Sequence, residues 1–122
     1  MGLALEQDPA FDGHRADAHA FERMSDEEKD AFIKENPAYG KIICRCEGVS
    51  EGEIRAAIRQ NPPATDIDGV KRRTRSGMGR CQGGFCMPYV VELLAKEYGC
   101  DYTEITKFGG KSYINIGKTK EV

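Results

Sequence analysis

Four of the five cysteines in this 122-residue chain form two tight pairs, and these pairs restrict what the chain can fold into. Cys44 and Cys46 lie in KIICRCEGVSEGEI, and Cys81 and Cys86 lie in GMGRCQGGFCMPYV. Such pairs form disulfides, hold a metal or carry out thiol redox chemistry. The N-terminus has no basic segment and no long apolar segment, so we predict no secretory signal and a cytosolic protein. Cytosolic thiols stay reduced, which favours metal binding or catalysis over disulfides.

The spacing of apolar and capping residues predicts a small, mainly α domain. The stretches SDEE and SEGE are capping-box signatures and predict helices at about residues 26–35 and 51–60. A further helix is expected after Thr65, with acids in its first turn, bases in its last turn and Gly77 at its end. An apolar stripe from Met87 to Tyr98 at helical spacing predicts the clearest helix of the chain.

The chain divides into three expected parts. Residues 41–107 form the helical core, residues 1–40 form an acidic arm with one helix, and residues 108–122 form a tail with room for one short strand. The arm carries ten acids and four bases, whereas the remainder carries ten acids and fourteen bases. Only 39% of the residues are hydrophobic, so a metal staple would help so small a core. No apolar run is long enough to predict a membrane span.

Both cysteine pairs precede predicted helix starts, where free N–H groups and the helix dipole stabilise thiolates. Glycines in the second loop, including Gly79, Gly83 and Gly84, allow the backbone to curve around a bulky anion. One and four intervening residues both depart from the commonest zinc spacings. A [2Fe–2S] cluster spreads four thiolates over two irons and tolerates one tight and one loose pair. Zinc and a dithiol switch of Cys81 and Cys86 remain alternatives.

A basic, acid-free stretch surrounds the second pair. No acid lies between Gly69 and Val91, where five bases occur, including Arg80. These bases either offset the charge of a cluster or form a solvated helix face. Arg45, between two candidate ligands, is either a cation beside the cluster or an exposed residue. No aromatic residue interleaves the run, so nucleic acid is not the expected partner.

The stretch CRCEGVSEGEI, followed by DGVKRRTRSGMGRCQGGFC, resembles the BFD-like [2Fe–2S]-binding domain, named after bacterioferritin-associated ferredoxin. The resemblance covers about residues 38–106, and the Cys81-x4-Cys86 spacing is similar to the version at the C-terminus of FAD-dependent oxidoreductases of the anaerobic glycerol-3-phosphate dehydrogenase type. It implies a helix-turn-helix fold in which Cys44, Cys46, Cys81 and Cys86 hold the cluster in loops.

The resemblance also implies the context of the chain. It would be the C-terminal electron-transfer part of a larger flavoenzyme, with FAD on an upstream domain and with an electron-acceptor protein or quinone-linked subunit as partner. No flavin-binding GxGxxG unit follows a strand here, and we expect no catalytic residue in the chain. It would be cytoplasmic, reaching a membrane only through partner subunits. The alternative is a structural or interaction module in which zinc or a cluster only staples the core.

Overall fold

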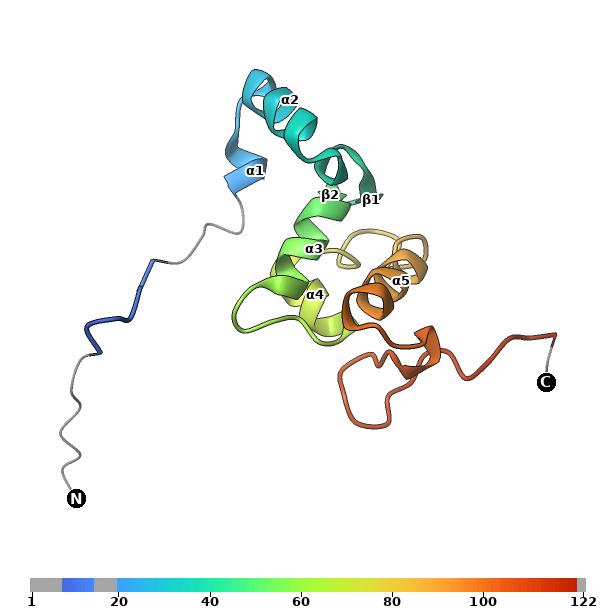
Figure 1. Cartoon of the computed structure of the whole chain (residues 1–122). Coiled ribbons are helices and arrows are strands. Elements are labelled where there is room, and N and C mark those ends of the chain that lie inside the picture. The colour runs from blue at the N-terminus through green and yellow to red at the C-terminus, as the bar shows by residue number, and fades with distance from the viewer. Residues whose placement is uncertain (1–7, 15–19, 121–122) are drawn as a thin grey trace.

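The computed structural model describes residues 8–14 and 20–120. Figure 1 shows two short strands between the N-terminal helices and the three α-helices that follow the strands. In chain order the elements are α1 (Ala20–Arg23), α2 (Asp26–Glu35), the 3-10 helix η1 (Pro37–Gly40), β1 (Ile42–Cys44), β2 (Val49–Ser50), α3 (Glu51–Arg59), α4 (Ile67–Thr74), α5 (Met87–Tyr98) and the 3-10 helix η2 (Tyr102–Glu104). The mainly α fold class predicted from the sequence is therefore confirmed. None of these helices is long and apolar enough to cross a membrane.

Capping boxes start the helices α2 and α3, as the sequence predicted. The Ser25 hydroxyl accepts from the backbone N–H of Glu28, and the Glu28 carboxylate accepts from the Ser25 N–H at 2.8 Å. Ser50 and Glu53 repeat this arrangement at the start of α3. Each box satisfies N–H groups that have no partner within the helix. The second box also fixes the direction in which the chain leaves the hairpin.

The sequence predicted the end of α5 correctly but misplaced the end of α4. Gly99 ends α5 in the left-handed region with φ of 64°, as expected of a C-terminal glycine. The prediction that Gly77 ends α4 was wrong. The helix stops at Thr74, because Arg75 already adopts the left-handed conformation with φ of 64° and its N–H closes on Lys71 O. A non-glycine residue in this region is uncommon, so no sequence rule would place the turn there.

The antiparallel strands β1 and β2 form a short hairpin that carries the first cysteine pair. Ile42 pairs with Ser50 and Cys44 with Val49, with an irregularity of register between the two pairs. Because β2 runs directly into α3, the hairpin and the helix form one continuous unit. The tight turn between the strands includes Gly48, whose φ is +68°.

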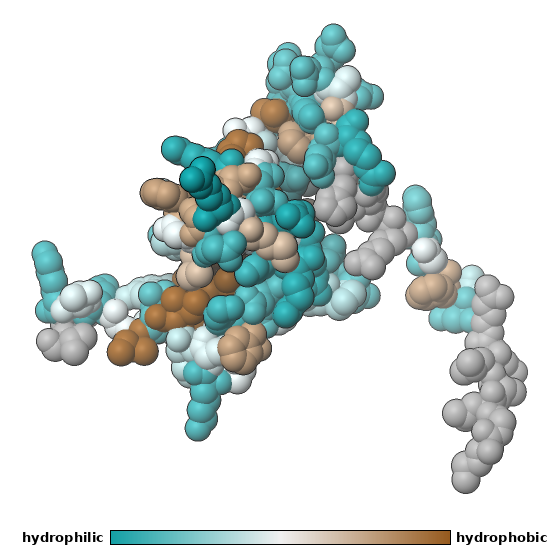
Figure 2. All heavy atoms as spheres, turned by 180° about the vertical axis from the view of Figure 1, so that it is seen from behind, coloured by the Kyte–Doolittle hydropathy of each residue, from teal (hydrophilic) through white to brown (hydrophobic). Residues whose placement is uncertain are grey.

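The core lies between α3, α4 and α5. Its most completely buried large side chains are Ile54, Leu94 and Val70, one from each of these helices. Residues from the hairpin and from the segment after α5 complete it, namely Ile43, Val49 and Ile105. On the face opposite to that of Figure 1, hydrophilic side chains cover most of the surface, with small groups of hydrophobic ones between them (Figure 2).

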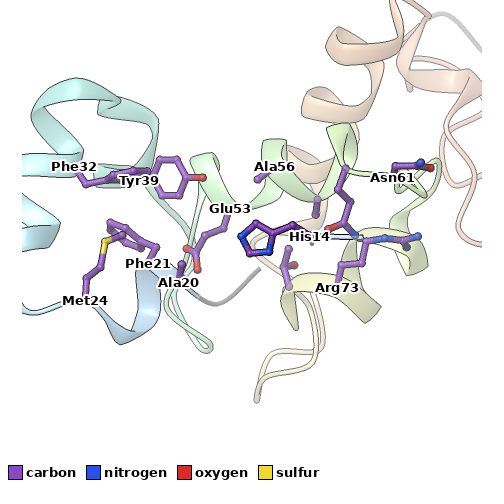
Figure 3. A pocket seen from close by; sticks show the side chains of 13 residues that line it. His14, Ala20, Phe21, Met24, Phe32, Tyr39, Glu53, Ala56, Asn61 and Arg73 are labelled. Carbon is purple, nitrogen blue, oxygen red and sulfur yellow. The ribbon is translucent and has the colours of Figure 1, made fainter. Parts of the chain in front are cut away.

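An aromatic cluster joins the acidic arm to the hairpin side of the core. Phe21, Phe32 and Tyr39 pack with ring centroids 4.7–5.8 Å apart. The Tyr39 ring also lies on Gly52, where a Cβ would collide with it, which explains a glycine in the first turn of α3. These rings line one side of a hollow that His14 also borders, and Figure 3 shows His14 between the rings and the end of α3. No cysteine lines this hollow.

The segment after α5 returns to the start of α4. Lys107 O accepts from the Asp68 N–H at 2.8 Å, and the Lys107 ammonium contacts the Asp68 carboxylate at 3.0 Å. Further along, the predicted short strand is reduced to a single bridge between Thr106 and Tyr113. Ile114 packs against the core.

Candidate metal centre

The fold brings together the four cysteines predicted as ligands. Cys44 ends β1, Cys46 lies in the turn after it, Cys81 lies in the loop between α4 and α5, and Cys86 is the N-cap of α5. All are free thiols. Cys44 and Cys86 are 1% and 2% exposed, whereas Cys81 is half-buried and Cys46 is exposed. One side of the group therefore faces the core and the other faces the surface.

The Cys81 thiol lies among backbone donors. The N–H of Phe85 is the main cause that lowers the pKa of Cys81, followed by the neighbouring Cys46 side chain and the N–H groups of Gly83 and Gly84. A thiolate here is stabilised by hydrogen bonds to its charged form. Gly83 has φ of +86°, which lets the loop turn its amides inward, so this glycine is required for the geometry.

The Cys86 thiol has the opposite environment. Burial is the largest cause that raises the pKa of Cys86, and the neighbouring Cys44 and Cys81 thiols raise it further. The Ser76 side chain acts in the other direction and lowers this pKa. Two like groups that both need to be anionic raise each other's pKa unless a cation compensates them. The buried half of the centre thus needs a positive charge between the thiols before they can all ionise.

The four thiols form neighbouring pairs, not a single point of convergence. Cys46 contacts Cys81, Cys44 contacts Cys86, and Cys81 also influences Cys86. Among the described residues, no three His, Cys, Asp or Glu side chains group as they would around a single metal ion. A binuclear cluster takes its four thiolates on two separate irons. Two adjacent thiol pairs are compatible with four thiolates spread over two irons.

Gly79 shows how closely the two cysteine loops approach each other. A Cβ at this position would collide with the Cβ of Cys46, and Glu47 Oε1 would lie 3.1 Å from it. Gly79 is buried, although its exposed neighbour Arg80 borders the surface hollow beside the thiols. The position therefore admits no side chain while the pairs remain adjacent. This observation supports the sequence prediction that the glycines let the second loop curve inward.

The surface beside Cys46 and Cys81 combines apolar and cationic side chains. These two thiols line a shallow hollow with the cations Lys41, Arg45 and Arg80. Its apolar walls are unusually open to solvent: Phe85 is 78% exposed, and Tyr89 and Ile42 are about half exposed. A large exposed aromatic residue next to a functional group indicates a contact surface.

The basic run predicted to surround the cysteines is divided by the fold. Arg73 donates to the carbonyls of Gly69 and Pro62, so it holds the backbone around α4. Arg75 Nε lies 2.8 Å from Glu47 Oε2 and ties the end of α4 to the hairpin turn. Arg80 stays beside the thiols. Arg80 is thus placed to offset charge at the centre, whereas Arg73 and Arg75 are held in structural contacts.

Sequence reasoning missed one residue of the site. Ser76 is 4% exposed, and its hydroxyl influences Cys86. Its neighbours in the sequence form no motif that indicates this role, because the contact depends on the left-handed turn at Arg75. A buried serine between a basic run and a glycine loop has no signal of its own.

Comparison with known proteins finds a family model that matches the part of the chain carrying these four cysteines. Residues 42–96 match the model of the BFD-like [2Fe-2S] binding domain. The chain is 49% identical over 116 residues to a glycerol 3-phosphate dehydrogenase of Caloramator mitchellensis, covering 95% of this chain and 24% of that protein. It is 47% identical over 58 residues to the HcnB component of the hydrogen cyanide synthase of Pseudomonas aeruginosa, covering 48% of this chain and 12% of the relative.

A third relative is also much longer than this chain. One subunit of the anaerobic glycerol-3-phosphate dehydrogenase of Escherichia coli K12 is 35% identical over 66 residues, covering 54% of this chain and 12% of the relative. The chain thus spans about a quarter or less of the length of these relatives. No solved structure is significantly similar to it.

Proposed function

Residues 42–96 of this chain are a BFD-like [2Fe–2S] binding domain, and on that premise we propose that the chain is the iron–sulfur electron-transfer part of a flavin-dependent dehydrogenase. The observation that carries the proposal is the adjacency of the two thiol pairs at one end of the core. When bound, a [2Fe–2S] cluster supplies a centre that accepts and donates single electrons.

Cys44, Cys46, Cys81 and Cys86 would hold the cluster. Their surroundings suit an anionic centre: backbone N–H groups converge on Cys81, and Gly79 leaves room for the loops to meet. The buried pair excludes water from one side of the centre, and burial and hydrogen bonding to sulfur are what set the potential of such a site. Gly83 and Gly84 act on Cys81 through their backbone N–H groups, so they need no side chain for this role.

The exposed side of the centre is where we expect electrons to be exchanged. Cys46 and Cys81 lie toward the surface, whereas Cys44 and Cys86 lie behind them against the core. Arg45 and Arg80 border the exposed side and would favour partners that present negative charge there. The exposed Phe85 ring offers an apolar contact at the same place.

The remainder of the enzyme is a proposal that the length of the relatives supports. We place FAD and the oxidation of a small substrate, with glycerol 3-phosphate as the first candidate, on a longer polypeptide that precedes this chain. The arm, residues 1–40, would then join the two parts, and residues 41–107 and 108–122 would be the cluster domain and its tail. The acceptor would be a protein or quinone-linked subunit, and the enzyme would be cytoplasmic.

Reconstitution tests the proposed function directly. The purified chain, treated with iron and sulfide under anaerobic conditions, is expected to bind two irons and two sulfides, the composition of a [2Fe–2S] cluster. Substituting Cys44, Cys46, Cys81 or Cys86 by serine should each reduce the iron content several-fold. Cys100→Ser is the matched control, because Cys100 is partly buried against the core and outside the thiol group.

Two outcomes would overturn the proposed function, and one would change the set of ligands. A colourless protein with one tightly bound zinc would make the chain a metal-stapled module. Full cluster loading in any of the four serine variants would remove that cysteine from the ligand set. A metal-free, folded protein in which Cys81 and Cys86 form a reversible disulfide would make it a dithiol switch.

A further inference from the structure

The Ser76 hydroxyl is a buried polar group that makes no hydrogen bond of good geometry in the described structure. Among residues 8–14 and 20–120, its Oγ is the only buried side-chain nitrogen or oxygen that lacks a hydrogen bond. Ser76 as a whole is 4% exposed, so water does not compensate the hydroxyl. Folded proteins rarely leave such a group unpaired, because its desolvation is not repaid. A stronger acceptor than the unligated polypeptide offers would satisfy this hydroxyl.

The backbone around Ser76 fixes where this hydroxyl lies. The left-handed turn at Arg75 reverses the chain after α4, and the Ser76 N–H donates to Thr74 Oγ1 at 3.2 Å. The Arg75–Glu47 ion pair at 2.8 Å holds the same turn against the hairpin. A Cβ on Gly77 would lie 3.9 Å from Gly83 Cα, so the next residue packs against the second cysteine loop. The turn therefore contacts the hairpin on one side and the second cysteine loop on the other.

The neighbour of this hydroxyl is the most buried thiol of the second pair. Ser76 acts on Cys86, which is 2% exposed, in the direction expected of a donor facing its sulfur. Cys81 receives several backbone N–H groups, whereas at Cys86 the Ser76 hydroxyl is the neighbouring group that favours the thiolate. A neutral thiol is a weak acceptor, but a thiolate bound to iron carries negative charge and accepts more strongly.

We infer that the Ser76 hydroxyl donates a hydrogen bond to the Cys86 sulfur once that sulfur ligates the cluster, and that this bond raises the reduction potential of the centre. The inference rests on the proposed function. Reduction adds one negative charge to the centre, and a donor aimed at a ligand sulfur stabilises the more negative state. Ser76 is thus a tuning residue that contacts a ligand and not the irons themselves.

Two readouts on the reconstituted full chain test this inference. Ser76→Ala should load the cluster normally, yet its midpoint potential should shift to a more negative value in an EPR-monitored titration. The iron–sulfur stretching bands in resonance Raman should also shift less between H2O and D2O than those of the wild type. Ser76→Thr keeps a hydroxyl and should retain a potential nearer that of the wild type. Ser112→Ala removes a hydroxyl that bonds within the C-terminal loop and should change neither readout.

The outcomes separate this inference from the proposed function. If the wild-type chain binds no cluster, the proposed function fails and the inference falls with it. If Ser76→Ala loads normally and its potential and deuterium shifts match those of the wild type, the inference alone is wrong. If Ser76→Ala and Ser76→Thr lower the potential equally, the effect arises from packing at this position and the hydrogen bond is refuted.

Discussion

At Gly79 the backbone of one cysteine loop passes so close to Cys46 on the other that no side chain fits. Unlike Gly83, this glycine does not have a positive φ, so its role is the close approach and not an unusual conformation. The need for a glycine at position 79 therefore links the loop of Cys81 and Cys86 to the turn that carries Cys46. Changing one backbone position should therefore disturb thiols that are far away in the sequence.

Gly79→Ala is expected to lower cluster occupancy several-fold and to destabilise the chain by about 1–3 kcal/mol, the usual cost of overpacking. The added Cβ would push Cys46 away from Cys81. Iron content after reconstitution and urea unfolding measure the two effects. Gly13→Ala is the control, because its Cβ would meet only Phe11 at an ordinary 3.6 Å. Normal iron content in Gly79→Ala would show that the loops separate without loss.

At the scale of elements, an ion-pair network joins α3 to α5. Glu97 on α5 accepts from Arg55 at 2.6 Å and from Arg59 at 2.7 Å, both on α3. Arg55 also pairs with Glu51, whose carboxylate contacts Lys41 at 2.8 Å. Hydrogen bonds and charge from Arg59, supported by Arg55, lower the pKa of Glu97. The network holds the helix that follows the first pair against the helix that follows the second.

Glu97→Gln should reduce the free energy of unfolding by about 1 kcal/mol at neutral pH. Because folding lowers the pKa of Glu97, its contribution is fully present above the ordinary value near 4.5 and is lost as pH falls through the lower, folded value. The difference between wild type and variant in urea unfolding should therefore shrink below about pH 4. Glu92→Gln, on the exposed side of the same helix, is the control. A difference that stays constant down to about pH 2 would contradict this assignment.

The elements also show what could be predicted from the sequence. Capping boxes at Ser25 and Ser50 act through neighbours three residues apart, so local pattern located both helix starts. The end of α4 was misplaced because Arg75 adopts a conformation that its residue type disfavours, and a long-range ion pair accompanies that turn. The packing of Tyr39 on Gly52 and the contact of Ser76 with Cys86 depend likewise on tertiary structure.

The candidate ligands could be nominated from the sequence for a different reason. The four cysteines stand in a local pattern that indicates their chemistry, and the fold only had to bring the pairs together. Which thiols face the core could not be predicted, because Cys44 and Cys86 are buried by residues of α3, α4 and α5 that no single stretch contains. The sequence therefore indicates which side chains could bind a metal, and the structure shows which of these thiols face the core and which face the surface.

On the scale of the whole molecule, the helical core supports two buried thiols and presents two others toward the surface. The hairpin and the loop before α5 meet at one end of the core, and the aromatic cluster packs the acidic arm against the start of α3, in a hollow that no cysteine lines. The two more exposed thiols are therefore the part of the group at which the proposed function expects electron exchange. The proposed function thus depends on a redox-active cluster at this one place.

An EPR-monitored redox titration of the anaerobically reconstituted chain tests that claim most directly. We predict a signal from a single unpaired electron that is absent in the oxidised protein, appears on reduction with dithionite and disappears on reoxidation, with one electron taken up per two irons. A protein that binds metal and folds, yet shows no reversible EPR signal or redox wave across the range accessible to dithionite, would contradict the electron-transfer function.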